Sequence, residues 1–353
     1  MEAVQEPRRG RDLGIVVGTL PTGPLNAVTD VPGVRVGHTT LVEGDSIRSG
    51  VTAIVPDQLT DRRSLPAGLF VGNGHGKMVG STQVAELGEI ETPVVLTATL
   101  STFRAADALV TYMLGQPGRE TAESLNPVVA ETNDGFLSDI RARPVREQHV
   151  LAALAEARGG LPAEGAVGAG TGTAALGFKA GIGTSSRLAT TSRGSVTVGV
   201  LVQSNFSGLL QVCGVPIRPE QVGVPSLSLP GRPEQPGNSC VIVVATDGRL
   251  DARQLGRVAR RAVFAMARVG SDFAGGSGDY ALAFSTADTQ APTAPESDLE
   301  PVFAAVLEAV EEALLNSLFM ARTTVGVKGR VKHAVPHDRM LDLLRAHRVE
   351  LRT

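Results

Sequence analysis

Two kinds of apolar spacing occur along the chain, and together they predict strands and helices in an irregular order. Strands are predicted where apolar, often β-branched residues run continuously or alternate with polar ones, bounded by Gly, Pro or Asn. Such runs lie at residues 26–41, 51–55, 69–74, 93–100, 127–135, 195–205, 240–245, 281–284 and 324–327. Several of these runs follow one another directly, so the predicted strands come in groups.

Apolar residues at helical spacing predict helices at residues 102–114, 147–158, 251–269 and 299–320, with a short one from Asp338. Ser101 is a suitable N-cap for the first of them, and Gly115 ends it. Groups of strands followed by helices, without a regular βαβ period, favour an α+β fold with sheets layered between helices. The chain has no 20–50-residue repeat and no linker that divides it, so we expect residues 1–353 to form a single domain.

Composition indicates a globular protein with an aliphatic core. The chain has 353 residues, a length typical of about two domains, with 42% hydrophobic and 20% charged residues. Aromatic residues make up only 3%, Trp is absent, and 41 residues are Gly. The core must therefore depend on aliphatic side chains and on close contact between backbones.

Charge and cysteine content argue against a nucleic-acid-binding protein and against a disulfide-rich secreted protein. The net charge is −3 and basic residues form no stripe, which argues against nucleic-acid binding. Two cysteines, Cys213 and Cys240, do not make a disulfide framework and favour a reducing compartment. The N-terminus has no signal-peptide pattern, and no run reaches the roughly 18 apolar residues of a membrane span. We expect a cytoplasmic protein without a membrane partner.

One junction has the residue types for unusual chemistry. A polar, Pro/Gly-rich segment, residues 230–238, leads into the apolar run 240–245, and Asn238 and Ser239 stand between them. Self-cleavage of the Asn238–Ser239 bond would make Ser239 an N-terminal residue with a nucleophilic Oγ and a free α-amine. The alternative is an ordinary loop-to-strand junction with a capping serine, and the local sequence alone favours that alternative.

The usual hydrolase signatures are missing from the sequence. The six histidines show no HExxH spacing, and no GxSxG motif occurs. His75, in the loop GNGHG, is the histidine best suited to catalysis, although a lone histidine is more often structural. An N-terminal serine needs no histidine, because its own α-amine, with a pKa of about 7.7–8.0, can act as the base.

Three further residues could support such a serine. Ser277 and Asp279 lie two apart in a glycine-rich loop before a strand, where the carboxylate could hold an α-ammonium or orient the hydroxyl. Asn205, at the end of the run 195–205, could donate its side-chain NH2 to an oxyanion. Ordinary turn chemistry explains each of these residues equally well.

Two other features are better explained by structure than by a ligand. The segment 168–172 (GAGTG) resembles a dinucleotide loop but lacks the third glycine at the required spacing, so we expect no nucleotide cofactor. The apolar stripe of the helix 299–320 is expected to face the core or a subunit interface. No metal site is predicted.

Taken in order, many blocks of the sequence resemble the DmpA-type family of self-processing aminopeptidases, which includes β-peptidyl aminopeptidases. The resemblance covers nearly the whole chain. The blocks are residues 27–40, 50–54, 72–76, 128–131, 168–172, 177–187, 198–205, 238–239, 243–247, 277–279 and 283–286.

The resemblance implies a four-layer αββα sandwich, like that of N-terminal-nucleophile hydrolases but differently connected. It implies self-cleavage into an α-chain, 1–238, and a β-chain, 239–353, that stay associated, and assembly as a homotetramer of the processed unit. By position, Ser239 matches the family nucleophile and Asn205 its oxyanion-hole asparagine. Ser277 and Asp279 match its Ser-Gly-acid pair, and Glu131 matches the carboxylate that binds the substrate's free amine.

The chain departs from the family pattern at three places. Some members have Glu in place of Asp279, and some have a Tyr just after the position of Glu131, where this chain has Asn133 as the candidate substrate-binding residue. The two tyrosines, Tyr112 and Tyr280, lie elsewhere in the sequence. Cys240 follows Ser239, so a cut shifted by one residue would create an N-terminal cysteine, but the spacing to the blocks 243–247 and 277–279 favours Ser239.

We therefore predict a self-processing N-terminal-serine aminopeptidase or amidase that needs no cofactor. It would release an N-terminal residue from short peptides, amides or esters through an acyl-enzyme. One alternative is acyl transfer, as in ornithine acetyltransferases, which use a processed Thr in a different motif. Another is an uncut, non-catalytic relative that binds or assembles. The sequence leaves open a preference for α-, β- or D-amino acid substrates.

Overall fold

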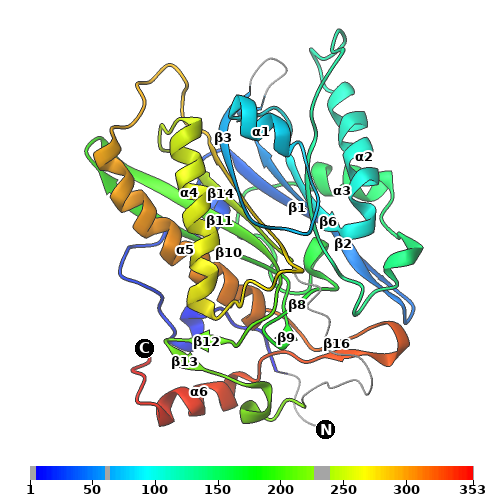
Figure 1. Cartoon of the computed structure of the whole chain (residues 1–353), viewed down its shortest axis with the longest axis vertical. Helices are drawn as coiled ribbons and strands as arrows, with labels where there is room; N and C mark the ends of the chain where they lie inside the picture. The colour runs from blue at the N-terminus through cyan, green and yellow to red at the C-terminus, as the bar shows by residue number, and fades with distance from the viewer. Residues whose placement is uncertain (1–4, 60–63, 226–238, 353) are drawn as a thin grey trace.

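Two β-sheets packed face to face form the centre of the protein, and helices cover the outer face of each (Figure 1). The computed structural model describes residues 5–59, 64–225 and 239–352. The five-stranded sheet has the order β1 (Val34–Glu43), β2 (Ile47–Pro56), β6 (Val94–Ala98), β7 (Val128–Thr132) and β4 (Met78–Val79). Its strands β6 and β7 are parallel, and its other neighbours are antiparallel.

The second sheet has six strands and contains the predicted junction. Its strands are β10 (Ile182–Thr191), β11 (Gly194–Asn205), β14 (Ser239–Thr246), β15 (Gly278–Ser285), β3 (Leu65–Gly74) and β5 (Glu89–Ile90). The two central strands, β14 and β15, are parallel to each other, whereas their outer neighbours are antiparallel to them. The N-termini of β14 and β15 therefore lie at the same end of the sheet as the C-termini of β11 and β3.

Six α-helices occur among the described residues: α1 (Ser81–Leu87), α2 (Thr102–Leu114), α3 (Glu147–Ala155), α4 (Ala252–Ala265), α5 (Leu299–Phe319) and α6 (His337–Ala346). Helices α2 and α3 pack on the five-stranded sheet, and α4 and α5 pack on the six-stranded sheet. Three short hairpins complete the structure: β8 (Ala174–Ala175) with β9 (Phe178–Lys179), β12 (Gln211–Val212) with β13 (Val215–Pro216), and β16 (Thr324–Val325) with β17 (Val331–Lys332).

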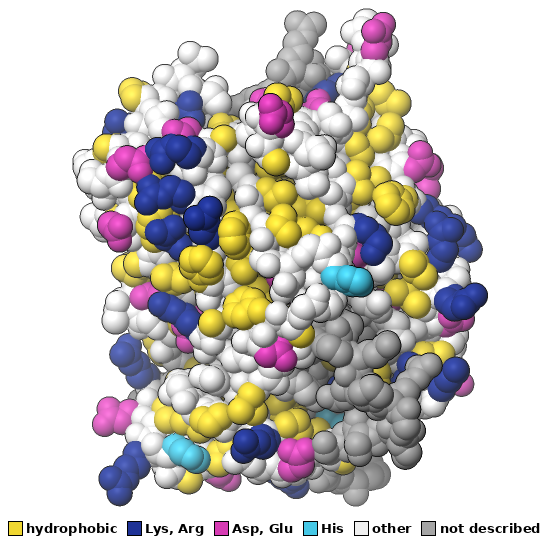
Figure 2. All heavy atoms as spheres, viewed as in Figure 1, with side chains coloured by type: hydrophobic (Ala, Val, Ile, Leu, Met, Phe, Trp, Pro, Cys, Tyr) yellow, Lys and Arg dark blue, Asp and Glu magenta, His cyan; other side chains and the backbone are white. Residues whose placement is uncertain are grey.

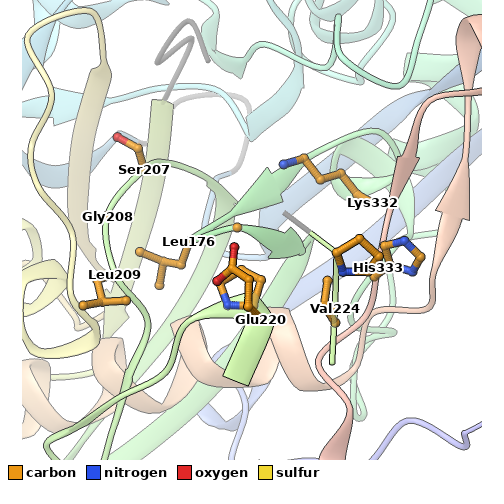
Figure 3. A pocket seen from close by; sticks show the side chains of 11 residues that line it. Leu176, Ser207, Gly208, Leu209, Glu220, Val224, Lys332 and His333 are labelled. Carbon is orange, nitrogen blue, oxygen red and sulfur yellow. The ribbon is translucent and has the colours of Figure 1, made fainter. Parts of the chain in front are cut away.

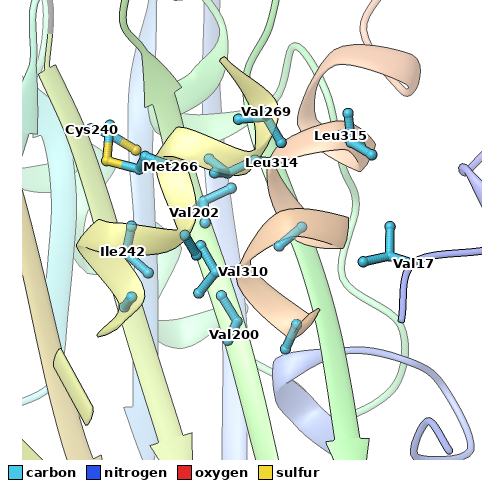
Figure 4. Close-up of a cluster of buried hydrophobic side chains, with 14 of the residues drawn as sticks. Val17, Val200, Val202, Cys240, Ile242, Met266, Val269, Val310, Leu314 and Leu315 are labelled. Carbon is cyan, nitrogen blue, oxygen red and sulfur yellow. The ribbon is translucent and has the colours of Figure 1, made fainter. Parts of the chain in front are cut away.

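Three apolar layers hold this arrangement together. The first joins α2 and α3 to the five-stranded sheet, the second fills the space between the sheets, and the third joins α4 and α5 to the six-stranded sheet. Figure 4 shows the third layer, where Val202 and Ile242 of the sheet meet Val310 and Leu314 of α5. The predicted αββα sandwich is confirmed, and the apolar stripe of α5 is part of this core.

Close backbone contact, expected from the many glycines, occurs where α5 crosses β10. A Cβ on Gly183 would lie 2.0 Å from the carbonyl oxygen of Ala313, so only glycine allows the helix to approach this closely. The glycines of the segment 168–172 have the same explanation. A Cβ on Gly170 would lie 2.5 Å from the Ile182 nitrogen, and one on Gly172 would lie 2.0 Å from the Arg48 carbonyl oxygen. The segment is thus packed against backbone.

The predicted ranges overlap most of the long elements, but β10, α1 and most of the two-residue strands were not predicted. Strand β10 begins inside the segment interpreted as a glycine-rich passage, and its buried residues include Ser185, Ser186 and Arg187, which conceal an apolar pattern. Helix α1 is short and was also missed. The helix predicted at 147–158 ends at Ala155. No helix of the described residues is long and apolar enough to cross a bilayer.

Arg187 explains how a polar strand can lie in the core. Its guanidinium is fully buried and forms ion pairs with Glu312 at 2.6 Å and Glu308 at 3.1 Å, both on α5. Arg11 pairs with the same Glu312 at 2.9 Å. These contacts link the N-terminal segment, β10 and α5. By contrast, Figure 2 shows basic side chains gathered on the surface over α4, where Arg253 pairs with Glu296 in an exposed position.

We expect Arg187→Met to lower the free energy of unfolding by about 3–5 kcal/mol, because it removes a fully buried cation that pairs with two carboxylates and leaves Glu312 with Arg11. Arg253→Met is the matched control. It removes an exposed ion pair and should cost less than about 1 kcal/mol. Chemical denaturation of both variants measures the difference, and equal losses would contradict a structural role for the buried pair.

Candidate active site

The register of four neighbouring strands brings the predicted residues to one end of the six-stranded sheet. Ser239, the first residue of β14, pairs with Asn205, the last residue of β11. On its other side, Ser239 pairs with Gly278, the first residue of β15, and Gly278 pairs with Gly74 at the end of β3. Residues more than 200 positions apart thus form one row. Asn238, the other half of the predicted cleavage site, lies outside the described residues.

Asp279 is the centre of a buried hydrogen-bond network beside this row. Its Oδ1 accepts from Ser277 Oγ at 2.7 Å, and its Oδ2 accepts from Asn73 Nδ2 at 2.8 Å. The backbone N–H of Cys240 also contacts the carboxylate. Burial raises the pKa of Asp279 above its usual 3.8, and the three donors partly offset this effect. The predicted pairing of Ser277 with Asp279 is present. Asp279 lies opposite Cys240, the residue that follows Ser239 on β14.

The Asn205 side chain is held in a defined orientation. Its Oδ1 accepts the backbone N–H of Ala174, the first residue of the β8–β9 hairpin, at 3.1 Å. An amide has one oxygen acceptor and one NH2 donor group, so fixing the oxygen also fixes the direction of the donors. This is the arrangement that a hydrogen-bond donor for an oxyanion needs.

Glu131 lies near the end of β7 in the other sheet and is almost completely buried. Its Oε1 accepts from the Lys77 backbone N–H at 3.0 Å and lies 3.4 Å from Lys77 Nζ. Its Oε2 accepts from the Thr99 hydroxyl. A carboxylate fixed at both oxygens, whose ion-pair partner among the described residues is the half-exposed Lys77, is suited to binding a second cation.

Two candidates are not brought into this network. Asn133 is exposed, and its Oδ1 accepts the Gly135 N–H at 2.9 Å, which is turn chemistry. Its role in substrate binding stays a prediction. His75 is also exposed, and its backbone N–H, rather than its ring, contacts the site by donating to the Ser277 carbonyl at 3.0 Å.

Cys240 is poorly suited to be the nucleophile. It is fully buried in the apolar layer between the sheet and the helices. Burial, with a smaller contribution from the Asp279 carboxylate, raises the pKa of its thiol well above the usual value, so the thiolate is disfavoured. Successive side chains of a strand point to opposite faces, and Ser239 therefore faces the space between the two sheets.

Residues 26–332 match the model of peptidase family S58. The chain belongs to peptidase family S58. It is 39% identical to the β-peptidyl aminopeptidase BapA of Sphingosinicella xenopeptidilytica, over 96% of this chain and 91% of that protein.

Solved structures of similar proteins support the same assignment for this S58 peptidase. A β-aminopeptidase of a Burkholderia species superimposes with a TM-score of 0.87 and 38% identity, over 96% of this chain and 99% of that one. The L-aminopeptidase D-Ala-esterase/amidase of Ochrobactrum anthropi, described as a variant of the Ntn hydrolase fold, gives 0.86 and 36%, over 96% and 98%. The predicted family, layered fold and aminopeptidase or amidase class are confirmed.

Sequence reasoning missed several residues that hold the site of the S58 peptidase together. Asn73 lies in the loop that was considered only for His75, although Asn between glycines is itself typical of a turn that carries a functional side chain. Thr99, Lys77 and the Ala174 N–H act through contacts between distant segments. Nothing in their local sequence identifies them.

A pocket of about 190 Å³ opens near the same end of the sandwich (Figure 3). It is lined by the turn of the β8–β9 hairpin at Leu176 and Gly177, by residues 207–209 that follow Asn205, by part of 219–225 and by Lys332 and His333. None of the candidate catalytic residues lines it. The pocket therefore shares the hairpin with Asn205 but is separate from the row around Ser239.

We expect Gly278→Ala to disrupt the site, because a Cβ there would lie 2.8 Å from Gly76 Cα, a backbone atom. The overpacked loop should destabilise the protein by about 1–3 kcal/mol and lower peptidase activity by roughly 10²-fold through displacement of Asp279. Gly275→Ala, in the same loop with nothing within 4 Å, is the control. Thermal unfolding and peptidase assays of both variants measure the effects. Wild-type activity in Gly278→Ala would contradict the requirement for close contact.

Proposed function

We propose that this S58 peptidase cuts its own chain before Ser239 and then acts as an N-terminal-serine aminopeptidase or amidase. The observation that carries the proposal is the register that sets Ser239 between Asn205 and Gly278, beside Asp279. A nucleophile, an oriented amide donor and a buried carboxylate meet there. Residues 1–353 would act as one catalytic domain made of two chains, 1–238 and 239–353.

The cut begins with the Ser239 hydroxyl. Its Oγ attacks the carbonyl carbon of residue 238, the C–N bond to Ser239 breaks, and an ester with a free Ser239 amine forms. Water then hydrolyses the ester, giving a carboxylate on residue 238 and regenerating the hydroxyl. The products are a new C-terminus and an N-terminal serine.

In turnover, the neutral α-amine of Ser239 takes the proton from Oγ as Oγ attacks the substrate carbonyl. The side-chain NH2 of Asn205 donates to the resulting oxyanion. The ammonium returns its proton to the leaving amine, and an acyl-enzyme remains. Water, activated by the same amine, releases the acid and restores the serine.

Asp279 and Ser277 are suited to hold this amine. The carboxylate already contacts the N–H of Cys240, the neighbour of Ser239. In the processed chain it would stabilise the α-ammonium that forms when Oγ loses its proton. Because the pKa of Asp279 is raised, it loses its charge at a higher pH than an exposed aspartate, and its support weakens as the pH falls.

Glu131 would bind the free amino group of the substrate. A buried carboxylate near the end of β7 would pair with an ammonium at the N-terminus of a peptide, and this pairing would favour aminopeptidase over endopeptidase action. One relative is a β-peptidyl aminopeptidase and another is an L-aminopeptidase D-Ala-esterase/amidase, so α-, β- and D-amino acid residues are all candidates for the released residue. Short peptides and amides are the proposed substrates.

Assembly as a homotetramer in the cytoplasm completes the proposal. Exposed apolar side chains gather on and next to α2, at Leu100, Phe103 and Leu114. Phe103 is 68% exposed, which is costly for a large aromatic side chain unless a partner covers it. A contact between copies through α2 would bury this group.

We expect Ser239→Ala to remain a single chain without activity toward aminoacyl p-nitroanilides, whereas the wild-type protein separates into two fragments on denaturing mass spectrometry. Cys240→Ala is the matched control. It should be cut and active, with a modest loss of stability. Cleavage of Ser239→Ala, or loss of cleavage only in Cys240→Ala, would move the nucleophile away from Ser239.

The same measurement separates the alternatives. A wild-type chain that stays intact and shows no turnover would favour a non-catalytic relative. A cut chain that transfers an acyl group to an amine acceptor faster than to water would favour an acyltransferase. A single intact chain with full peptidase activity would exclude the proposed mechanism.

We expect Glu131→Gln to raise KM by about 10- to 100-fold for substrates with a free amine, because it removes a charge-assisted hydrogen bond of about 1.5–3 kcal/mol. The kcat should change much less. Glu91→Gln, a partly exposed carboxylate that caps residue 126, is the control. An unchanged KM in Glu131→Gln would place amine recognition elsewhere.

A further inference from the structure

Tyr280 lies on the same face of the six-stranded sheet as Ser239. Its partner on β14 is Val241, and both residues belong to the apolar layer between the sheets. Ser239 is two positions before Val241 and faces the same way. Gly278, directly across from Ser239, has no side chain. Tyr280 is therefore the first side chain of β15 on the face where the nucleophile lies.

The ring of Tyr280 runs back along β15 toward the level of Ser239. A Cβ built on Gly76 would lie 2.9 Å from Tyr280 Cε2 and 3.2 Å from Gly278 Cα. The outer edge of the Tyr280 ring and the backbone of Gly278, the residue paired with Ser239, are therefore both close to Gly76. The phenol end of Tyr280 lies beside Gly278, within the row of residues that forms the site.

The hydroxyl group is available as a hydrogen-bond donor. The backbone N–H of Gly76 contacts the phenol oxygen. Among the described residues, the hydrogen bonds include no acceptor for the Tyr280 O–H. Burial, with the nearby Glu131 carboxylate, raises the pKa of Tyr280 above its usual 10.0, so the proton stays on the oxygen at neutral pH.

We propose that the Tyr280 hydroxyl is the second donor to the oxyanion, on the side of Ser239 opposite to Asn205. This inference rests on the proposed function. Asn205 on β11 and Tyr280 on β15 flank β14 on one face, so a carbonyl attacked by Ser239 Oγ lies between an amide NH2 and a phenol O–H. Asn133, the residue considered for substrate binding, has its amide oxygen engaged in a turn instead.

The surrounding charges fit this role. Glu131 Oε1 lies 3.4 Å from the same point beside Gly76, so the ammonium-binding carboxylate and the phenol are neighbours. A substrate ammonium at Glu131 would offset the larger of the two negative charges that act on the phenol, those of Glu131 and Asp279. Binding of the correct substrate end therefore prepares the donor for the transition state.

The test uses Tyr280→Phe, which removes only the oxygen, and Tyr112→Phe, the same change in the other tyrosine of the chain, on α2. Removing an oxyanion donor costs about 10²–10³-fold in kcat. We expect Tyr280→Phe to be cut normally, to lose kcat by about that factor with little change in KM, and to lose affinity for an aminoacyl boronate in proportion. Its affinity for the product amino acid should not change.

Three outcomes for Tyr280→Phe would overturn the inference. The first is a kcat within twofold of wild type, and the second is a loss of activity that comes from a higher KM together with weaker product binding. The third is a chain that stays uncut or has a melting temperature well below that of Tyr112→Phe. The last outcome would make the hydroxyl a structural group. Wild-type protein and Ser239→Ala are assayed alongside. Active wild type with inactive Ser239→Ala upholds the proposed function even if Tyr280→Phe is fully active, so the two failures are distinguishable.

Discussion

The site depends on the backbone pairing of β11, β14, β15 and β3. This pairing alone brings Asn205, Ser239, Gly278 and Gly74 into one row, because no two of their segments are adjacent in sequence. Hydrogen bonds then fix the orientation of the side chains in and beside this row. Asp279 accepts from three donors, and the Asn205 amide oxygen accepts from a backbone N–H. Since a shift of one residue turns every side chain of a strand to the other face, the register determines which groups can react.

The glycine-rich, aromatic-poor composition is part of the same design. Gly76 and Gly278 let two loops touch at the site, and Gly183 lets α5 lie against β10. Larger residues would separate these backbones by more than the tolerance of a catalytic hydrogen bond. The composition that first indicated an aliphatic core also indicates a site formed mainly by closely packed backbones.

The Ser239 junction and the long helices could be predicted from local sequence, whereas strand β10 and part of the site could not. The Ser239 junction is visible because a polar segment meets a β-branched run, and the helices show because their apolar spacing is regular. Strand β10 was hidden because its buried Arg187 is balanced by glutamates that lie more than 100 positions away. Asn73 and Tyr280 were missed for a related reason: their importance arises from contacts across strands, and neither residue has a motif of its own.

The strand order has a consequence for a processed protein. Reading across the six-stranded sheet, β10 and β11 precede Ser239 in the chain, β14 and β15 follow it, and β3 and β5 precede it again. After a cut before Ser239, strands β14 and β15 of the second fragment would lie between strands β11 and β3 of the first. The buried Arg187–Glu312 ion pair would also join the two fragments. The first fragment contains the whole five-stranded sheet, but neither fragment contains the whole six-stranded sheet. The cleaved enzyme would be an interlocked heterodimer whose subunits can separate only by unfolding.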